Sequence, residues 1–486
     1  MEKSYLYGAS VQGIQSFIFQ TNDLKSIVGA SELVEKVCTK CFEKYANNGE
    51  FIVNAAGNVK YLFRNEEDCK RAYREFPKDV MTEAPGITIS EAVVEVGNFK
   101  DAIQELERRL REQRNRRYAS STSGLMGMRR SKNTGQPVVK IYKDKYYDDA
   151  SWKKIQSSIG GQNATVALSE KCFGADELSP QRVALNISDI TDYNDWIAVV
   201  HADGNGIGNT IMGKNFDAKG LKEFSDNLSE STKKAAQKAY DDLIEKEKLD
   251  FNGKVIPIRP VVLGGDDFTF ICKASLAIPF VTYYLKRFEK ETKSRGLNLT
   301  ACAGVAFIKS SYPFHYGYSL AEILCEESKR DAKAIAKKTN GEIPSCLMFH
   351  KVQSSFIEEY DEIVAKELIT KDKESSLKFG PYYLHDQKDR WTISHLTESV
   401  DTIGLEQNGV SKSALRKWLG LLMNNSNMAL QRKERVDGLL NEKDRLVFDE
   451  ATEPVMRDGM KTYPAADILS LLTVETQVTR NNESEK

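Results

Sequence analysis

Three aspartates are the residues of this sequence best placed to do chemistry. Asp203 follows an apolar run, 196–202, that is typical of a buried strand, and Asp266 and Asp267 stand at the tip of a predicted hairpin, 256–272. If that strand and hairpin are neighbours, the three carboxylates converge and repel one another unless cations neutralise them. Mg²⁺ takes such oxygen ligands together with substrate phosphates, and a pair of such ions serves phosphoryl displacement. The pattern predicts a two-metal site, with a solvated turn as the alternative.

Two glycines precede the paired acids. Gly264 and Gly265 carry no side chain, so the backbone there can approach a phosphate closely. The flanks 261–263 and 268–271 are strongly apolar, which favours a hairpin anchored in a core over a free turn. We therefore expect phosphate to lie against these glycines, beside the metal site.

Two segments of the first half of the chain resemble the two segments that carry these acids and glycines, and this internal repeat indicates which elements hold them. The segments 5–18 and 197–211 are both apolar runs that break at a small-residue turn and continue through Gly-Ile, with Ser10 opposite Asp203. The hairpins 51–63 and 260–272 correspond in the same order, so that Ala55-Ala56-Gly57-Asn58 lies opposite Gly264-Gly265-Asp266-Asp267. The first copy has none of the three acids. We expect it to keep the fold and to have lost the metals; two unrelated α/β units with similar turns are the alternative.

Each copy predicts the order β-α-β-β-α-β, the ferredoxin-like or palm arrangement. The expected fold class is α+β, with two palms packed as a pseudo-dimer and followed by a helical C-terminal domain. The predicted elements of the first copy are a strand at 4–10, helices at 13–20 and 24–46, the hairpin at 51–63, a helix at 65–76, a strand at 87–96 and a helix at 98–117. Those of the second are a strand at 196–202, a helix at 218–246, the hairpin at 256–272, a helix at 275–294, a strand at 298–308 and a helix at 319–339.

Length and composition fit this organisation. The chain has 486 residues, 69 Lys+Arg against 70 Asp+Glu, and 41% hydrophobic residues, which excludes collagen-like, disordered and disulfide-scaffold classes. No run approaches the roughly 18 apolar residues of a membrane span, and no signal peptide is evident. Several of the eight Cys lie in apolar runs, as expected of reduced thiols. We expect a cytoplasmic protein with no membrane contact.

At these residues the chain resembles the large, polymerase/cyclase subunit of type III CRISPR effector complexes. VQGIQSFIF (11–19) and IVGASELVE (27–35) are similar to its first palm, and HADGNGIG (201–208), LGGDDF (263–268) and the segment 303–333 are similar to its second, catalytic palm. The resemblance implies a nucleotidyl cyclase or polymerase that converts ATP to cyclic oligoadenylate, or cyclic dinucleotide, second messengers in antiviral defence. It also implies CRISPR RNA, ribonucleoprotein subunits and target RNA as partners.

The resemblance implies roles by position. Asp203, Gly204, Asp266 and Asp267 would hold two Mg²⁺ or Mn²⁺ ions, one of which would activate a ribose hydroxyl. The residues expected to line the nucleotide site are Ser10, Gly29, Ala30, Ser31, Gly264, Gly265, Lys329 and Lys333. The two lysines would face the triphosphate, with an ordinary solvated helix face as the alternative.

The sequence also departs from the family. The first palm starts by Tyr5 and only one His-Asp pair is present, at His385-Asp386, so we expect a compact form without an HD nuclease. The usual zinc ribbon is missing, because Cys38 and Cys41 lie within a predicted amphipathic helix and have no second pair. A stand-alone cyclase, working as a homo-oligomer, is therefore an alternative to a complex subunit.

The remaining segments have less specific patterns. Residues 113–143 contain no Asp or Glu but eight Arg or Lys, a basic insert that could contact nucleic-acid or nucleotide phosphates or simply be a solvated loop. Beyond 346, helices are expected at 356–368, 411–423 and 464–472. The expected domains are a degenerate first palm at 1–118, the basic insert and a polar linker at 119–194, the catalytic palm at 195–345 and the helical domain at 346–486.

Two other functions stay open at this stage. A silent scaffold subunit would turn over no nucleotide and would co-purify with a ribonucleoprotein. A diguanylate-type cyclase would use GTP, since a Gly-Gly-Asp-Asp hairpin by itself suits that class too. The clustered acids favour an enzyme, because a scaffold gains nothing from three carboxylates whose desolvation is unfavourable.

Overall fold

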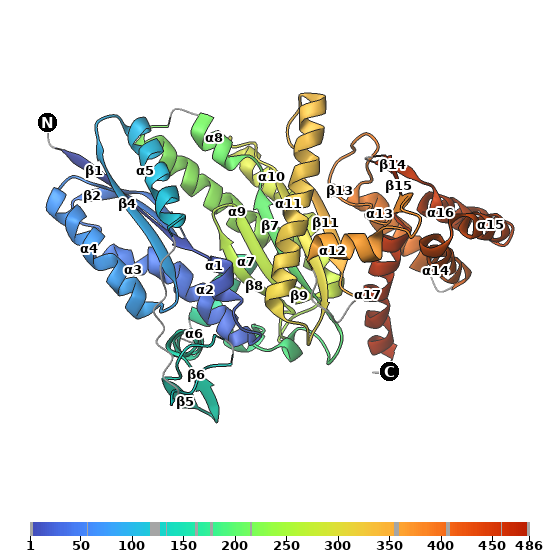
Figure 1. Cartoon of the computed structure of the whole chain (residues 1–486), viewed down its shortest axis with the longest axis horizontal. Helices are drawn as coiled ribbons and strands as arrows, with labels where there is room; N and C mark the ends of the chain where they lie inside the picture. Colours follow the sequence, from blue (N-terminus) through green and yellow to red (C-terminus); the bar gives the residue numbers. More distant parts are fainter. Residues whose placement is uncertain are drawn as a thin grey trace.

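The computed structural model describes residues 3–483 apart from 56, 117–126, 133, 161–163, 175–177, 214–215, 354–358, 405–408 and 458. Two sheets form its interior, and the chain passes along the long axis from the first sheet to the second and then to a helical region (Figure 1). None of the described helices combines the length and apolar character needed to cross a membrane.

The first unit has the predicted order of elements around a four-stranded sheet, β2-β3-β1-β4. Its elements are β1 (Ser4–Gln12), α1 (Ile14–Ile18), α2 (Leu24–Cys38), α3 (Lys40–Glu43), β2 (Gly49–Ala55), β3 (Asn58–Phe63), α4 (Glu66–Glu83), β4 (Thr88–Val96) and α5 (Phe99–Arg114). The prediction of a single helix at 24–46 is wrong in one respect. The helix is interrupted at Thr39, whose backbone leaves the helical region (φ −98°, ψ −90°). Phe42 beyond the break is still fully buried, which explains why the apolar stripe continues in the sequence.

The second unit repeats this arrangement. It contains β7 (Trp196–Gly204), α8 (Ile207–Gly213), α9 (Ala218–Lys246), β8 (Ile258–Gly264), β9 (Asp267–Lys273), α10 (Ala274–Ser294), β10 (Ala301–Lys309) and α11 (Phe314–Thr339). The order β8-β9-β7-β10 corresponds strand by strand to β2-β3-β1-β4. The registers agree too, since Ser10 pairs with Asn58 in one sheet, and Ala202 pairs with Phe268 in the other, directly next to Asp203 and Asp267. The two sheets thus have the same strand order and the same register at the positions that the repeat aligns.

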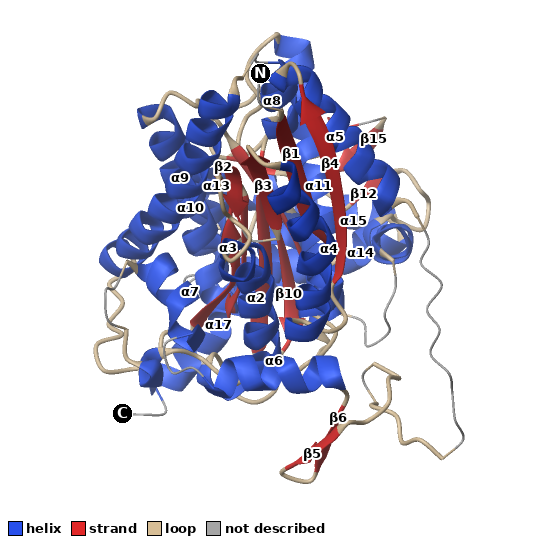
Figure 2. Ribbon diagram, turned by 90° about the vertical axis from the view of Figure 1, so that its left-hand side faces the viewer, coloured by secondary structure: helices blue, strands red, loops and turns tan. Residues whose placement is uncertain are grey.

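The two units share an apolar core. Side chains of α2 and the first sheet lie in one cluster with Val199, Val261, Ile308 and Tyr318 of the second unit. Phe19, just after α1, stacks on Tyr318 of α11 with ring centroids 4.7 Å apart. Figure 2 shows the strands of both units in the interior with helices around them. This core fixes the first unit against the second next to α11.

The segment between the units is folded. It contains a hairpin of β5 (Lys140–Tyr142) and β6 (Lys145–Tyr147), followed by α6 (Asp149–Gly160) and α7 (Ala164–Phe173). α6 packs closely on α2. The contact leaves no room for a side chain at Gly29, where a Cβ would lie only 1.8 Å from the carbonyl oxygen of Lys154. The region expected as a polar linker is therefore in part a structural layer. Of the basic insert, residues 117–126 and 133, Arg117 among them, lie outside the described residues.

Beyond residue 345 the chain first extends the second sheet. β11 (Cys346–Lys351) runs parallel to β10, and β13 (Tyr382–Tyr383) pairs with β11. The boundary expected at 345/346 thus falls at the start of a strand of the same six-stranded sheet. The region after it contains α12 (Tyr360–Ile363), α13 (Ile393–Gly404), α14 (Gly409–Asn424), α15 (Ser426–Asp437), α16 (Glu442–Thr452), α17 (Ala465–Glu483) and a small sheet of β12 (Ser375–Ser376), β14 (Val455–Arg457) and β15 (Met460–Thr462). The expected helices at 411–423 and 464–472 are α14 and the first part of α17, whereas part of the one expected at 356–368 lies outside the described residues.

Candidate active site

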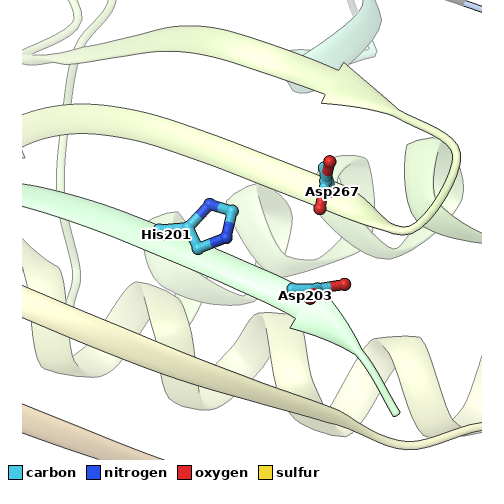
Figure 3. Close-up of side chains that lie close together, drawn as sticks. All are labelled: His201, Asp203 and Asp267. Atoms are coloured by element: carbon cyan, nitrogen blue, oxygen red, sulfur yellow. The ribbon is translucent and has the colours of Figure 1, made fainter. Parts of the chain in front are cut away.

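Asp203 and Asp267 meet at the end of two neighbouring strands of the second sheet. Asp203 is the residue before last of β7, and Asp267 is the first residue of β9, which pairs with β7 in antiparallel register. Figure 3 shows the two carboxylates on adjacent strands at the same end of the sheet, with His201 further along β7 to their left. One ligand atom from each of these three residues lies within 4.8 Å of the others. Strand pairing alone therefore brings together acids that are far apart in the sequence.

Asp266 completes the cluster from the turn between β8 and β9. Gly265 takes a left-handed conformation there (φ +62°), which glycine adopts without steric cost. The hydroxyl of Thr232 on α9 donates a hydrogen bond to the carbonyl oxygen of Gly265 (2.7 Å) and holds the turn. A Cβ on Gly204 would lie 2.9 Å from that of Asp266, so the two turns are in tight contact. Glycines at both turns, Gly204 and Gly265, are therefore needed for the carboxylate of Asp266 to approach those of Asp203 and Asp267.

One lysine enters the cluster. The ammonium of Lys329, on α11, forms an ion pair with Asp203 and donates to the carbonyl oxygen of Gly204 (3.0 Å). Its side chain is 15% exposed and that of Asp203 is 30% exposed. Burial by itself would lower the pKa of Lys329, but the carboxylate of Asp203 outweighs it and raises that pKa. Lys329 therefore stays charged and compensates one of the three acids.

The other two acids are left with excess negative charge. Burial, together with the neighbouring carboxylates of Asp203 and Asp267, raises the pKa of Asp266 to about 8. Burial and the charge of Asp203 raise the pKa of Asp267 to about 7, against the opposing effect of Lys329. Such shifts mean that ionising the site without a cation is unfavourable. Carboxylate oxygens that are crowded and poorly compensated are the ligand set that hard divalent cations take, so the residues present fit Mg²⁺ or Mn²⁺.

His201 is a site residue that the sequence reasoning missed. Its Nδ1 lies 3.0 Å from the hydroxyl of Thr269 on β9, and burial lowers the pKa of its imidazole to about 4. The ring is therefore neutral. Its position two residues before Asp203 could have indicated that it belongs to the site, because the side chains of residues i and i+2 of a strand point to the same face of the sheet.

α11 presents one further acid to the cluster. Glu322 lies two turns before Lys329, and burial raises the pKa of its carboxyl, with Asp203 as a smaller contributor. The hydroxyl of Tyr318 donates to Glu322 (3.4 Å), and the Tyr318 ring meets the His201 ring at a centroid distance of 5.6 Å. The helix therefore forms one wall of the site.

The structure places the other predicted residues as follows. Lys333, one turn after Lys329, is exposed. Gly29 and Ala30 are buried inside α2, with Gly29 closed off by α6, and Ser31 of the same helix donates to the carbonyl oxygen of Val261 on β8. Small residues at 29–31 thus serve close packing of α2. Ser10 pairs with Asn58 and Ser90 in the first sheet.

A cavity of about 510 Å³ lies where the first unit faces α8 and α9. Asn58, the first-unit counterpart of Asp267, is on its wall, and its Oδ1 is buried and has no hydrogen-bond partner. Lys60 on the same wall forms an ion pair with Glu107 of α5 (2.5 Å). Gly208 and Ile211 of α8, the helix that follows Asp203, close the other side. The cavity thus combines the degenerate turn of one unit with the helix next to the acids of the other.

Known proteins show the same second unit and the same fold. Residues 196–338 match the family described as Cas10/Cmr2, second palm domain. No curated protein sequence matches the chain. A chain of the Csm1–Csm4 cassette solved in complex with cA4 has a TM-score of 0.58 at 13% identity, over 97% of this chain and 69% of that chain. A chain of the same cassette solved in complex with one ATP has a TM-score of 0.57 at 14% identity, over the same shares of the two chains.

The Csm1–Csm4 subcomplex of the type III-A CRISPR-Csm interference complex gives a TM-score of 0.51 at 14% identity. At these identities the likeness is one of fold, and it extends over nearly the whole chain. The resemblance predicted from the sequence is therefore confirmed: residues 196–338 match the second palm domain of the Cas10/Cmr2 family, and the chain has the fold found in the Csm1–Csm4 cassette.

Proposed function

We propose that this protein is a metal-dependent nucleotidyltransferase that converts ATP to cyclic oligoadenylate, as part of antiviral defence. One observation carries the proposal: Asp203, Asp266 and Asp267 converge at one end of the second sheet, and Lys329 forms an ion pair with Asp203. Two divalent cations, Mg²⁺ or Mn²⁺, would be held by these three carboxylates and the carbonyl oxygen of Gly204. Bound there, they would stabilise the charge that develops on the attacking and leaving oxygens.

Side chains and backbone of the protein would accept the proton, bind the triphosphate and hold the adenosine. Asp203 or Asp267 would accept the proton of the attacking ribose hydroxyl, since the two residues lie side by side where β7 ends and β9 begins. The Gly264-Gly265 backbone would lie against the triphosphate, held by Thr232. Lys329 would place a positive charge beside it. The cavity lined by Asn58 and α8 would take an adenosine moiety between the two palms, arranged as a pseudo-dimer with the first one degenerate.

We further propose that the protein works beside a subunit related to Csm4, within a ribonucleoprotein that holds CRISPR RNA and target RNA. Support comes from the solved relatives, whose fold covers 97% of this chain and which were solved as Csm1–Csm4 assemblies. ATP as substrate is supported by the same set, which includes complexes with ATP and with AMPPNP.

The test is a product assay with the full chain, with and without its ribonucleoprotein partners and target RNA. ATP and GTP are supplied together with Mg²⁺ or Mn²⁺, and products are identified by mass spectrometry. We expect cyclic oligoadenylate from the wild type and none from Asp266→Ala/Asp267→Ala. Full activity in that double variant would remove the two-metal assignment. Products built from GTP would identify a diguanylate-type cyclase, and absence of turnover in every condition would identify a scaffold.

A further inference from the structure

A second cavity, of about 410 Å³, lies between the β5–β6 hairpin and the start of α2. We call it the hairpin pocket. Its lining residues are Gln20, Thr21, Asp23, Ser26, Arg129, Arg130, Ser131, Lys132, Asp144, Lys145, Tyr146, Tyr147, Ser151 and Lys154. The volume is in the range of small-molecule sites, about 300–1,000 Å³. Five of these residues are basic and two are acidic.

Lys154 is the unusual member of this pocket. It is only 1% exposed, and its ammonium donates to two neutral acceptors, the carbonyl oxygen of Phe17 (2.6 Å) and Oε1 of Gln20 (3.1 Å). The ammonium also lies 4.0 Å from the centroid of the Phe17 ring, which is likewise neutral. Burial lowers the pKa of Lys154 to about 8, which shows that its surroundings compensate the charge poorly. A buried cation in that condition would gain from an anion in the pocket.

Two of the other basic side chains, Arg129 and Arg130, contact neutral groups. Arg129 lies over the ring of Tyr146 at 3.4 Å, and Arg130 donates to the carbonyl oxygen of Gly135 (3.1 Å). The partners that the structure gives both residues, within the part of the chain it describes, are thus neutral. Of the two acids, Asp23 is occupied as the N-cap of α2, where it accepts from the backbone and hydroxyl of Ser26 (3.2 and 2.7 Å). The pocket therefore has excess positive charge.

The pocket is held in shape by a buried carboxylate. Asp148, 1% exposed, accepts hydrogen bonds from the backbone and hydroxyl of Ser151 at the start of α6 (3.0 and 2.7 Å). It also accepts from Thr134 of the insert (2.8 Å), which ties the wall that carries Arg129 to the helix that carries Lys154. Tyr147 of the hairpin packs on Trp152 of α6 with ring centroids 5.9 Å apart. A ligand would thus meet a site that is already formed.

The pocket is separate from the carboxylate cluster. In both Figure 1 and Figure 2, α8, which follows Asp203, lies at the upper end of the molecule, and the β5–β6 hairpin lies at the lower end. The two sites have no lining residue in common. A ligand of the hairpin pocket therefore cannot be the reacting nucleotide at the carboxylates.

From this geometry we propose that the hairpin pocket is a second binding site, for the phosphate groups of a nucleotide-sized ligand. Phosphate suits it because arginine and lysine donors bind its oxygens in charge-assisted hydrogen bonds. The phosphates could belong to a free nucleotide or to the end of a single-stranded nucleic acid, since both present the same oxygens to Arg129, Lys132 and Lys154.

The experiment measures binding of inorganic pyrophosphate to the full-length protein by calorimetry, with EDTA present. Without divalent cations the three carboxylates of the other site repel this anion, so only the hairpin pocket should respond. We expect Arg129→Ala/Lys132→Ala to weaken binding about tenfold or more. Lys143→Ala is the matched control, because it removes a basic side chain from the hairpin tip that does not line the pocket. Lys154→Met extends the series, with thermal unfolding to show that it folds.

A second arm adds a 5′-phosphorylated single-stranded RNA to the pyrophosphate titration. Competition assigns the pocket to a nucleic-acid end, and no competition assigns it to a free nucleotide; both support the proposal. No pyrophosphate binding to the wild type would overturn it. Equal affinities of the wild type and of a folded Arg129→Ala/Lys132→Ala variant would overturn it too. Neither result depends on ATP turnover, so failure here is distinct from failure of the proposed function.

Discussion

Lys329 forms an ion pair with Asp203 although 126 positions separate the two residues in the sequence. α11 crosses the second sheet so that its lysine reaches the end of β7, where it also binds the carbonyl oxygen of Gly204 at 3.0 Å. Among the described residues, the structure gives Asp266 and Asp267 no ion pair of this kind. The protein thus neutralises only part of the charge of the cluster, as the proposed metal site requires.

Removing Lys329 should separate turnover from metal binding. In Lys329→Met, Asp203 loses the contact that holds it, and we expect nucleotide turnover to fall roughly 10- to 100-fold. The affinity for Mn²⁺ should stay equal or rise, because the cluster gains one net negative charge. Lys333→Met, one turn further along α11 and exposed, is the control and should behave as wild type. Equal rates for the two variants would contradict the assigned position of Lys329.

The raised pKa values of the acids make metal binding depend on pH. Mg²⁺ or Mn²⁺ must displace the protons that burial keeps on Asp266 and Asp267, whose pKa values are about 8 and about 7. Affinity should therefore rise with pH up to about 8, by at most about tenfold per pH unit for each proton displaced. Calorimetry in buffers of different ionisation enthalpy measures the released protons. An affinity that is flat between pH 6 and pH 8 would show that the acids are already ionised.

The same shifts predict how stability changes without metal. Between the ordinary aspartate pKa of 3.8 and about 8, the native state keeps protons that the unfolded chain has released. The metal-free protein should therefore lose stability as pH rises through 7 and 8, and Mg²⁺ should restore it. Asp266→Asn should flatten this dependence. Thermal unfolding in EDTA at several pH values tests both statements, and a wild-type midpoint that rises from pH 6 to pH 8 would contradict them.

Thr232 should matter for turnover more than for stability. Thr232→Val removes the hydrogen bond to Gly265 and should cost about 1 kcal/mol of unfolding free energy. Because the turn that carries Asp266 is then released, we expect turnover to fall roughly tenfold. Thr282→Val is the matched control: it removes a buried hydroxyl that bonds only within its own helix, to the carbonyl oxygen of Ile278 (2.7 Å). Similar turnover in the two variants would rule out a positioning role for Thr232.

Substitution of Gly29 tests whether this residue serves the packing of α2 on α6 rather than contact with a nucleotide. A Cβ at this position would meet the carbonyl oxygen of Lys154 at 1.8 Å, so Gly29→Ala should separate α2 from α6. We expect a loss of roughly 1–3 kcal/mol in stability, as for other overpacked positions. Gly420→Ala, in α14 with open space around it, should show no such loss. An unchanged unfolding midpoint in Gly29→Ala would mean that α2 and α6 are not in this tight contact.

Much of the fold and the acid site could be predicted because the relevant signals are local or repeated. The apolar flanks of Asp203 and of the Asp266-Asp267 turn define strands, and two strands of a ferredoxin-like order lie side by side wherever that order is met. The internal repeat added the first unit, including the correspondence of Ser10 and Asn58 with Asp203 and Asp267. The break at Thr39 and the helices α6 and α7 were missed, since polar or interrupted segments have weak periodicity.

The sequence by itself thus determined the order of elements in the two units and the place of the three aspartates at strand ends, because alternation of apolar residues and turn-forming glycines is encoded within short segments. Only the tertiary structure decided that Lys329 rather than Lys333 reaches the acids, and that Gly29 packs against α6. It also brought Lys154 and the basic insert together into the hairpin pocket. These are contacts between segments far apart in the chain, and they depend on how helices cross the sheets, a geometry that no local pattern specifies.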